Sequence, residues 1–125
     1  MIKLVKGIPE KLVEMDEQVT LVEQMNEDTG RPVILVNKFN VDPDEVDMFL
    51  KDWEKDATYF RRQPGCISAQ LHQGIGGSGV FVNYAVWEST SLCKKAPSNI
   101  DIPDLLSSYP PSTVASPPVF RKVAV

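Results

Sequence analysis

The most regular hydrophobic pattern in the chain lies between Pro43 and Arg62. Apolar residues recur there three, four and seven positions apart, which is the spacing of one face of an α-helix. They are Val46, Phe49, Leu50, Trp53, Ala57 and Phe60. Asp42 as N-cap, Pro43 and Glu45 resemble a capping box, and Pro64-Gly65 follows the last turn. The pattern predicts an amphipathic helix over residues 43–62.

Three further segments have the alternation or β-branched composition of strands: residues 33–41, 66–73 and 80–88. Alternation divides the first strand into two faces. One face holds Val33, Leu35, Asn37, Phe39 and Val41, and the other holds Ile34, Val36, Lys38 and Asn40. In the second strand, Ser68, Gln70 and His72 are expected on the face opposite Ile67, Ala69 and Leu71.

The second and third strands are joined by a glycine-rich stretch, residues 74–79, which predicts a hairpin. Its glycines match the dinucleotide-binding fingerprint letter by letter. In that fingerprint a helix N-terminus follows the glycines and holds the pyrophosphate. Here Val80, Phe81 and Val82 follow, which is a strand. We therefore interpret the glycines as a loop.

The two ends of the chain are less regular. The stretch from Pro9 to Gly30 is predicted as a helix, although Val19–Val22 is equally strand-like. Its apolar face would hold Leu12, Val19, Val22 and Met25. After Ser89 a short helix over residues 90–95 is cut by Pro97. A further helical turn at 103–109, an extended proline-rich link and a last strand at 119–125 complete the chain.

The resulting order, β-α-β-β-α-β, predicts an α+β, ferredoxin-like domain with an antiparallel sheet and a short or broken second helix. We expect residues 1–31 to be an N-terminal extension and residues 32–125 to be the domain. A sheet covered by helices on one face leaves the other face exposed. That face holds Ile34 and Val36, with either Phe81 and Ala85 or Val82 and Val86 from the third strand. So apolar a face predicts a homodimer.

Composition narrows the class of protein. A net charge of −4 argues against binding nucleic acid. No apolar run approaches the ~20 residues that cross a bilayer, and the N-terminus lacks a signal-peptide core, so a cytoplasmic protein with no membrane partner is expected. Cys66 and Cys93 fit neither a metal spacing nor a disulfide framework, which favours buried free thiols. We expect no metal and no cofactor.

From Pro32 onward the chain resembles the antibiotic biosynthesis monooxygenase (ABM) family. The resemblance rests on the strand VILVNKFNV, the helix with FLKDWEKDA, and the segments RRQPGCISAQLHQ and FVNYAVWEST. It implies a dimeric α+β barrel, with a pocket in each subunit between sheet and helices. Well-studied members oxidise aromatic polyketide phenols or quinols with dioxygen, without metal or flavin. The proline-broken second helix departs from the family pattern.

Such chemistry needs a few polar groups on an otherwise apolar wall. Asn37 and Trp87 are the candidates for catalysis, with Asn83 as a second pocket amide. For Asn37, an amide bonded to neighbouring backbone is an equal alternative, and for Trp87 a core role is the simpler one. The apolar lining would come from Leu35, Phe39 and Trp53, the last of which is also a core candidate.

His72, the only histidine, is either a general base or, more simply, a polar residue at an interface. The resemblance leaves two other functions open. One is a non-catalytic, stress-related or structural dimer of the same fold. The other is haem degradation, for which relatives use an asparagine, a tryptophan and a histidine on the second helix. Asn37 and Trp87 match, but residues 89–118 contain no histidine.

Overall fold

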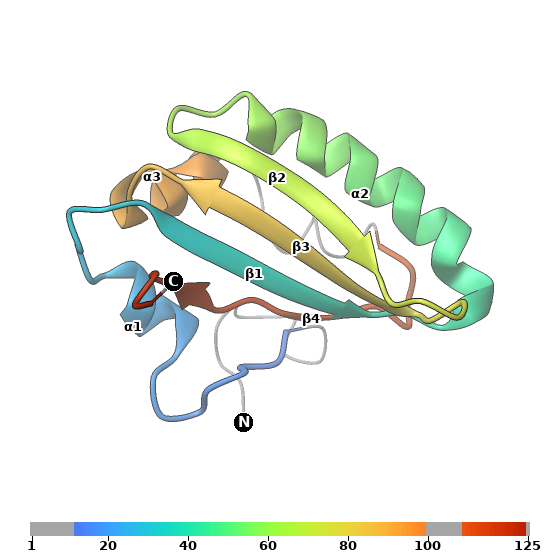
Figure 1. The fold of residues 1–125 in the computed structure, drawn as a ribbon. Coiled ribbons are helices and arrows are strands. Elements are labelled where there is room, and N and C mark those ends of the chain that lie inside the picture. Colours follow the sequence, from blue (N-terminus) through green and yellow to red (C-terminus); the bar gives the residue numbers. More distant parts are fainter. Residues whose placement is uncertain (1–11, 100–108, 125) are drawn as a thin grey trace.

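The computed structural model describes residues 12–99 and 109–124 (Figure 1). The elements along the chain are α1 (Leu21–Met25), β1 (Val33–Asn40), the 3₁₀ turn η1 (Pro43–Glu45), α2 (Val46–Arg61), β2 (Cys66–Gln73), β3 (Val80–Trp87), α3 (Thr90–Lys95), the 3₁₀ turn η2 (Ala96–Asn99), β4 (Val114–Ser116) and β5 (Val119–Phe120). The strands form one antiparallel sheet in the order β2-β3-β1-β4, and β5 also pairs with β1. The α+β, ferredoxin-like class predicted from the sequence is confirmed.

Helix α2 runs along the sheet beside β2 and β3 (Figure 1) and packs on what we call the inner face. Phe49 is completely buried, with its ring centroid 5.0 Å from that of Phe39 and 4.8 Å from that of Phe81. Phe39 and Phe81 lie directly opposite each other on β1 and β3. Burial of such large aromatic rings contributes strongly to the stability of the core.

The start of the helix differs from the predicted capping box. Residues 43–45 form a 3₁₀ turn, and Asp42 makes no side-chain cap hydrogen bond. Glu45 Oε1 accepts from the backbone N–H of Ser112, at 3.1 Å. The apolar stripe is also narrower than predicted, because Leu50 is 38% exposed. The Glu45 side chain, which was predicted to cap the helix, therefore connects the start of the helix to the C-terminal segment.

The C-terminal strand prediction was wrong in its bounds. Instead of one strand at 119–125, two short strands, β4 and β5, pair with β1 on either side of Pro117 and Pro118. Proline lacks the N–H that continuous pairing needs. The Pro118 carbonyl still accepts from the Val36 N–H, at 3.0 Å. The short, interrupted second helix was predicted correctly for α3 and η2, and the expected turn at 103–109 falls mostly outside the described residues.

The N-terminal helix is much shorter than predicted. Only α1 is helical, and it begins at a capping box made by Thr20 and Glu23. Residues 12–20 are irregular, with Leu12 forming a parallel bridge to Ala115 and joining the core. Residues 9–11 lie outside the described part of the chain. Leu12 is thus buried through an extended segment, whereas Val19 and Val22, predicted on the same helical face, are exposed.

The glycine stretch is a hairpin loop, as interpreted. Gly76 and Gly77 have φ of 80° and 74°, a region that favours glycine. A Cβ on Gly79 would lie 2.0 Å from the carbonyl oxygen of Val41, so only glycine fits there. The Val41 N–H donates to the Gly79 carbonyl, which holds the hairpin against the end of β1. β3 follows at once, so the loop opens no helix that could hold a pyrophosphate.

One residue of β2 does not follow the predicted alternation. Cys66 pairs with Trp87 and Ser68 with Val86, so Ile67 is an extra residue in a bulge and is 55% exposed. Ala69 and Leu71 remain on the inner side and pack against the core. Cys66 and Cys93 are free, but only Cys93 is fully buried, and burial raises its pKa to about 12.

Candidate functional site

The inner face of the sheet carries a pair of asparagines in an apolar surface. Asn37 of β1 and Asn83 of β3 are directly opposite each other in the antiparallel register. Side chains in such a pair lie roughly 5 Å apart at their Cβ atoms. The next pair on one side is Phe39 with Phe81, and on the other it is Leu35 with Ala85. The two amides are therefore adjacent, and apolar residues border them along both strands.

Both asparagine oxygens lack a protein partner. Asn37 Oδ1 and Asn83 Oδ1 are buried, and neither accepts a hydrogen bond from any described residue. Leaving a buried polar atom unsatisfied costs about 1–3 kcal/mol. A natural reason for two such atoms side by side is a ligand or water that the pair binds. Sequence alternation predicted the shared face, and the strand register brings the two residues together.

Trp87 lies on the same face, at the end of β3. It pairs with Val33 across β1 and with Cys66 across β2. The indole is buried, and its Nε1, a donor, also has no partner in the described part of the chain. Trp87 is four positions from Asn83, about 13 Å along the strand. The tryptophan thus both fills the core and presents a free polar atom toward the interior.

The predicted apolar lining divides into core and border. Phe39 is buried under Phe49, and Trp53 belongs to the same cluster. Leu35 is half-buried and packs against the cluster that contains Trp87. Leu35 and Phe39 therefore flank Asn37 on its own strand, and Trp53 lies on α2, which covers this face.

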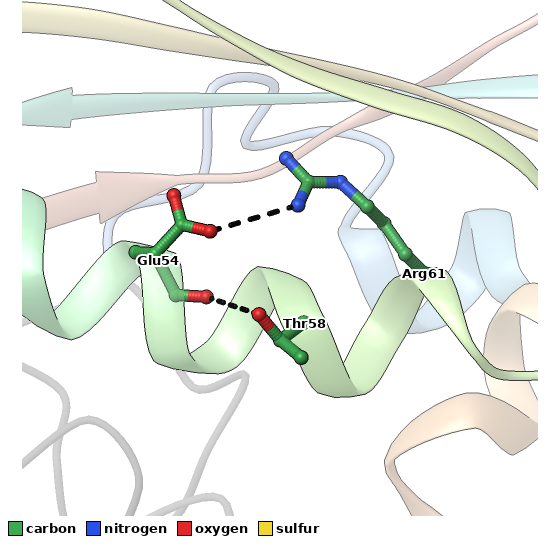
Figure 2. Close-up of polar contacts among 3 residues, drawn as sticks. All are labelled: Glu54, Thr58 and Arg61. Atoms are coloured by element: carbon green, nitrogen blue, oxygen red, sulfur yellow. Dashed lines mark hydrogen bonds and ion pairs between the residues drawn. The ribbon is translucent and has the colours of Figure 1, made fainter.

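Glu54 and Arg61 form an ion pair on the exposed part of α2. Figure 2 shows Arg61 directed back along the helix toward Glu54, with Arg61 Nη1 3.9 Å from Glu54 Oε2. The same picture shows Thr58 Oγ1 donating to the Glu54 carbonyl, at 2.9 Å. The Arg61 guanidinium lies 5.4 Å from the Trp53 ring centroid. Arg61 is thus held by partners on its own helix and does not belong with the asparagine pair.

His72 lies on the opposite face of the sheet from Asn37, Asn83 and Trp87. It is exposed and pairs with Val82, and its Nδ1 is 3.3 Å from the Val82 carbonyl oxygen. The structure does not bring it together with the other candidates. A proton acceptor on the inner face must therefore be another residue.

Sequence reasoning missed Asp56 and Tyr109. Asp56 Oδ2 is buried and has no partner among the described residues, while the carboxyl group interacts with the Tyr109 hydroxyl. Tyr109 is buried in the core cluster. The available signal was an acidic residue at the border of the apolar stripe, between Trp53 and Ala57. The contact with Tyr109 is not visible in the sequence.

Two surface hollows lie away from these residues. One, about 250 Å³, is lined by α1, β5 and Thr90, and a second lies between Arg31 and Lys122. No group of three His, Cys, Asp or Glu residues within 12–99 and 109–124 could hold a metal ion. Over the same ranges, no helix is long and apolar enough to span a membrane.

Comparison with known proteins agrees with the resemblance. Residues 32–92 match the family described as antibiotic biosynthesis monooxygenase. The resemblance to the ABM family is confirmed. The matched stretch includes Asn37, Asn83 and Trp87. No protein of curated function matches the chain in sequence.

Several solved structures superpose on about three quarters of the chain. A candidate monooxygenase from Shewanella loihica is 27% identical, with a TM-score of 0.65, over 76% of this chain and 97% of that one. SnoaB, a cofactor-independent oxygenase from Streptomyces nogalater, is 23% identical, with a TM-score of 0.65, over 76% and 96%. A candidate antibiotic biosynthesis monooxygenase from Caulobacter crescentus is 17% identical, with a TM-score of 0.66, over 76% and 92%.

Proposed function

We propose that this protein is a cofactor-independent monooxygenase that oxidises a small phenolic, quinol or polyketide-like aromatic compound with dioxygen. The observation that carries the proposal is the cross-strand pair of Asn37 and Asn83, whose buried oxygens lack partners among the described residues. The match to the ABM family and the fold shared with SnoaB support the same class of reaction.

The oxidation of a phenol by dioxygen needs few catalytic groups from the protein. An electron-rich phenol reduces dioxygen once it has lost its proton, so the site must bind it, favour the anion and exclude water. Asn37 and Asn83 each carry an NH₂ donor and a carbonyl acceptor. A phenol can donate to one amide oxygen and, as it ionises, accept from the amide nitrogens. The indole of Trp87 and the side chain of Leu35 would pack against its rings.

Haem degradation fits this site less well. His72 is the only histidine in the chain, and it lies on the face of the sheet opposite Asn37 and Trp87. A haem held against those two residues would therefore have no histidine from the same chain to bind its iron. We retain the monooxygenase as the proposed function.

The test of the function is oxygen consumption with a panel of hydroquinones and anthrones, with a chelator present and no flavin or metal added. We expect uptake that scales with protein concentration. With isotopically labelled dioxygen, one labelled atom should enter the product and the other should leave as water. Peroxide without label in the product would instead indicate an oxidase. No uptake above the protein-free rate for any compound would favour a non-catalytic role.

We further propose that the protein is a homodimer joined through the outer face of the sheet. The face is apolar at its centre, with Ile34, Val36, Val82 and Val86, and Tyr84 there is 42% exposed. An apolar sheet face of this extent is unusual on a monomer surface. Of the two pairs considered for β3, Val82 and Val86 lie on this outer face, because Phe81 and Ala85 are buried in the core.

Light scattering at micromolar concentration should give about twice the 13.9 kDa of one chain. Val82→Lys should yield a monomer, since a face-to-face contact would bury two unpaired ammonium groups. Met48→Lys is the matched control, because Met48 is an exposed apolar residue of α2. A monomeric wild type, or a dimer unchanged by Val82→Lys, would contradict the proposal.

A further inference from the structure

Two aromatic contacts fix how α2 lies along the sheet. Near its start, Phe49 packs on the pair of Phe39 and Phe81. Near its end, Phe60 packs in the cluster that contains Trp87. The helix therefore runs along the inner face from the phenylalanine pair toward the tryptophan, and its length spans the level of the asparagine pair.

Asp56 lies on the helix between these two contacts. It is seven residues beyond Phe49, or roughly 10 Å along the helix axis. The same distance corresponds to about three positions along β1, counted from Phe39 toward its start. That places Asp56 level with the segment between Asn37 and Leu35. Its Oδ2 is buried there and accepts no hydrogen bond from any described residue.

Tyr109 lies in the same core cluster on the inner face, between sheet and helix. Its ring stacks on Phe39, with centroids 6.2 Å apart, and lies 5.5 Å from that of Phe49. Its hydroxyl donates to the Asp56 carboxylate. Tyr109 therefore connects the phenylalanine cluster with Asp56.

We propose that Asp56 is the general base of this site, and that Tyr109 is the positioning residue that holds its carboxylate toward the substrate bound at Asn37 and Asn83. The inference rests on the proposed function and supplies what that function lacks. The asparagine amides can stabilise a phenolate, but they cannot accept a proton. His72, the other candidate, lies on the opposite face.

The step is a single proton transfer. The substrate O–H bond breaks, its proton bonds to Asp56 Oδ2, and the electron pair stays on the substrate oxygen as phenolate. The carboxylate becomes a neutral carboxylic acid, so total charge is conserved. The phenolate then donates electrons to dioxygen, which is the oxidant of the proposed function. Tyr109 keeps its own proton throughout, because burial raises its pKa far above the usual range.

The environment suits a carboxylate base. Burial raises the pKa of Asp56 and Asp52 adds to the rise, while the Tyr109 hydrogen bond and Lys55 lower it, and the net effect is upward. The inner-face residues of β1 and β3 at this level, Asn37, Leu35, Asn83 and Ala85, do not titrate. A base whose pKa is moved toward neutrality accepts a phenolic proton more readily than an ordinary aspartate does.

The test is the pH profile of oxygen uptake with a substrate that the wild type oxidises. In the wild type, kcat/KM should fall at low pH as Asp56 is protonated. Asp56→Asn, which has nearly the same shape, should lower kcat/KM by about 10²–10⁴-fold and abolish this low-pH limb. Its deficit should shrink at high pH, where the substrate ionises in solution. Asp47→Asn, at an exposed position of the same helix, should behave as wild type.

Tyr109→Phe makes the test specific. It removes a hydrogen bond that lowers the pKa of Asp56. The pKa should therefore rise and the low-pH limb should move to higher pH, without being abolished. A merely structural role for Tyr109 would lower the rate equally at every pH. Thermal unfolding and light scattering establish whether each variant is folded and assembled like the wild type.

The outcomes separate the two proposals. If the wild type oxidises a substrate and a folded Asp56→Asn variant keeps the same rate and low-pH limb, Asp56 is not the base, and the proposed function stands. A rate loss that is constant across pH would also overturn the inference. If the wild type oxidises nothing in the panel, the proposed function fails and the role of Asp56 fails with it.

Discussion

Asn37→Ala should turn over its phenolic or quinol substrate at about one hundredth of the wild-type rate or less, because removing one preorganised donor from a dry site costs ~10²–10³-fold. Negative charge develops on the substrate oxygen as the proton leaves. The amide nitrogen of Asn37 is proposed to donate to that oxygen. The loss should appear mainly in kcat, since the bond strengthens as charge develops.

The control for this variant lies on the same strand. Asn40→Ala removes the same amide from a residue that alternation places on the outer face, so it should leave kcat unchanged. Equal activity in the wild type and in a folded Asn37→Ala variant would remove Asn37 from the site. An equal loss in Asn40→Ala would indicate a general effect on the fold.

Asn83 extends this test to the pair. Because Asn37 and Asn83 are directly opposite, both amides are proposed to serve one substrate oxygen. The double variant should then lose less activity than the product of the two single losses.

Trp87→Phe should lower the rate less than Asn37→Ala, because a ring remains to pack the core. His72→Ala should change the rate little, given its exposed position on the other face.

The parts of the fold that could be predicted are those controlled by local pattern. The stripe through Phe49, Trp53 and Ala57 is long enough to specify a helix and its buried face. The alternation of residues along β1 likewise assigned Asn37 to the face of the strand that carries Leu35 and Phe39. Pro64-Gly65 and the glycines of the hairpin mark chain reversals by their backbone preferences, which are also local.

The errors arose where a distant contact replaced a local one. Glu45 has the spacing of a capping box, yet its carboxylate accepts from Ser112, 67 positions away in the chain. Leu12 reads as part of a helix but pairs with Ala115. Such contacts form only once the sheet has assembled, so no pattern within a short window can indicate them.

The candidate site divides in the same way. Its sheet side follows from alternation together with the register of β1 and β3, and Asn37, Asn83 and Trp87 were all among the predicted candidates. Its helix side depends on Asp56 meeting Tyr109, 53 positions later in the numbering. Tyr109 was predicted only as the end of a helical turn before two prolines, and that pattern did not indicate that its ring is buried.

The largest loss of stability should come from Phe49→Ala, at about 3–5 kcal/mol in the free energy of unfolding. The ring is completely inaccessible to solvent and contacts Phe39, Phe81 and Tyr109, so its removal leaves a cavity that these rigid rings cannot easily fill. It also joins α2 to the sheet beside the asparagine pair. Activity should therefore fall along with stability.

Leu50→Ala is the matched control, one position along the same helix. Leu50 is 38% exposed, so the same kind of truncation should cost no more than about 1 kcal/mol. Urea unfolding at one fixed protein concentration measures both variants, because dimer assembly would make the midpoint depend on concentration. Similar losses for the two variants would mean that α2 is not held to the sheet through Phe49. The position of Asp56 relative to Asn37, which was derived from the contact between Phe49 and Phe39, would then be unsupported.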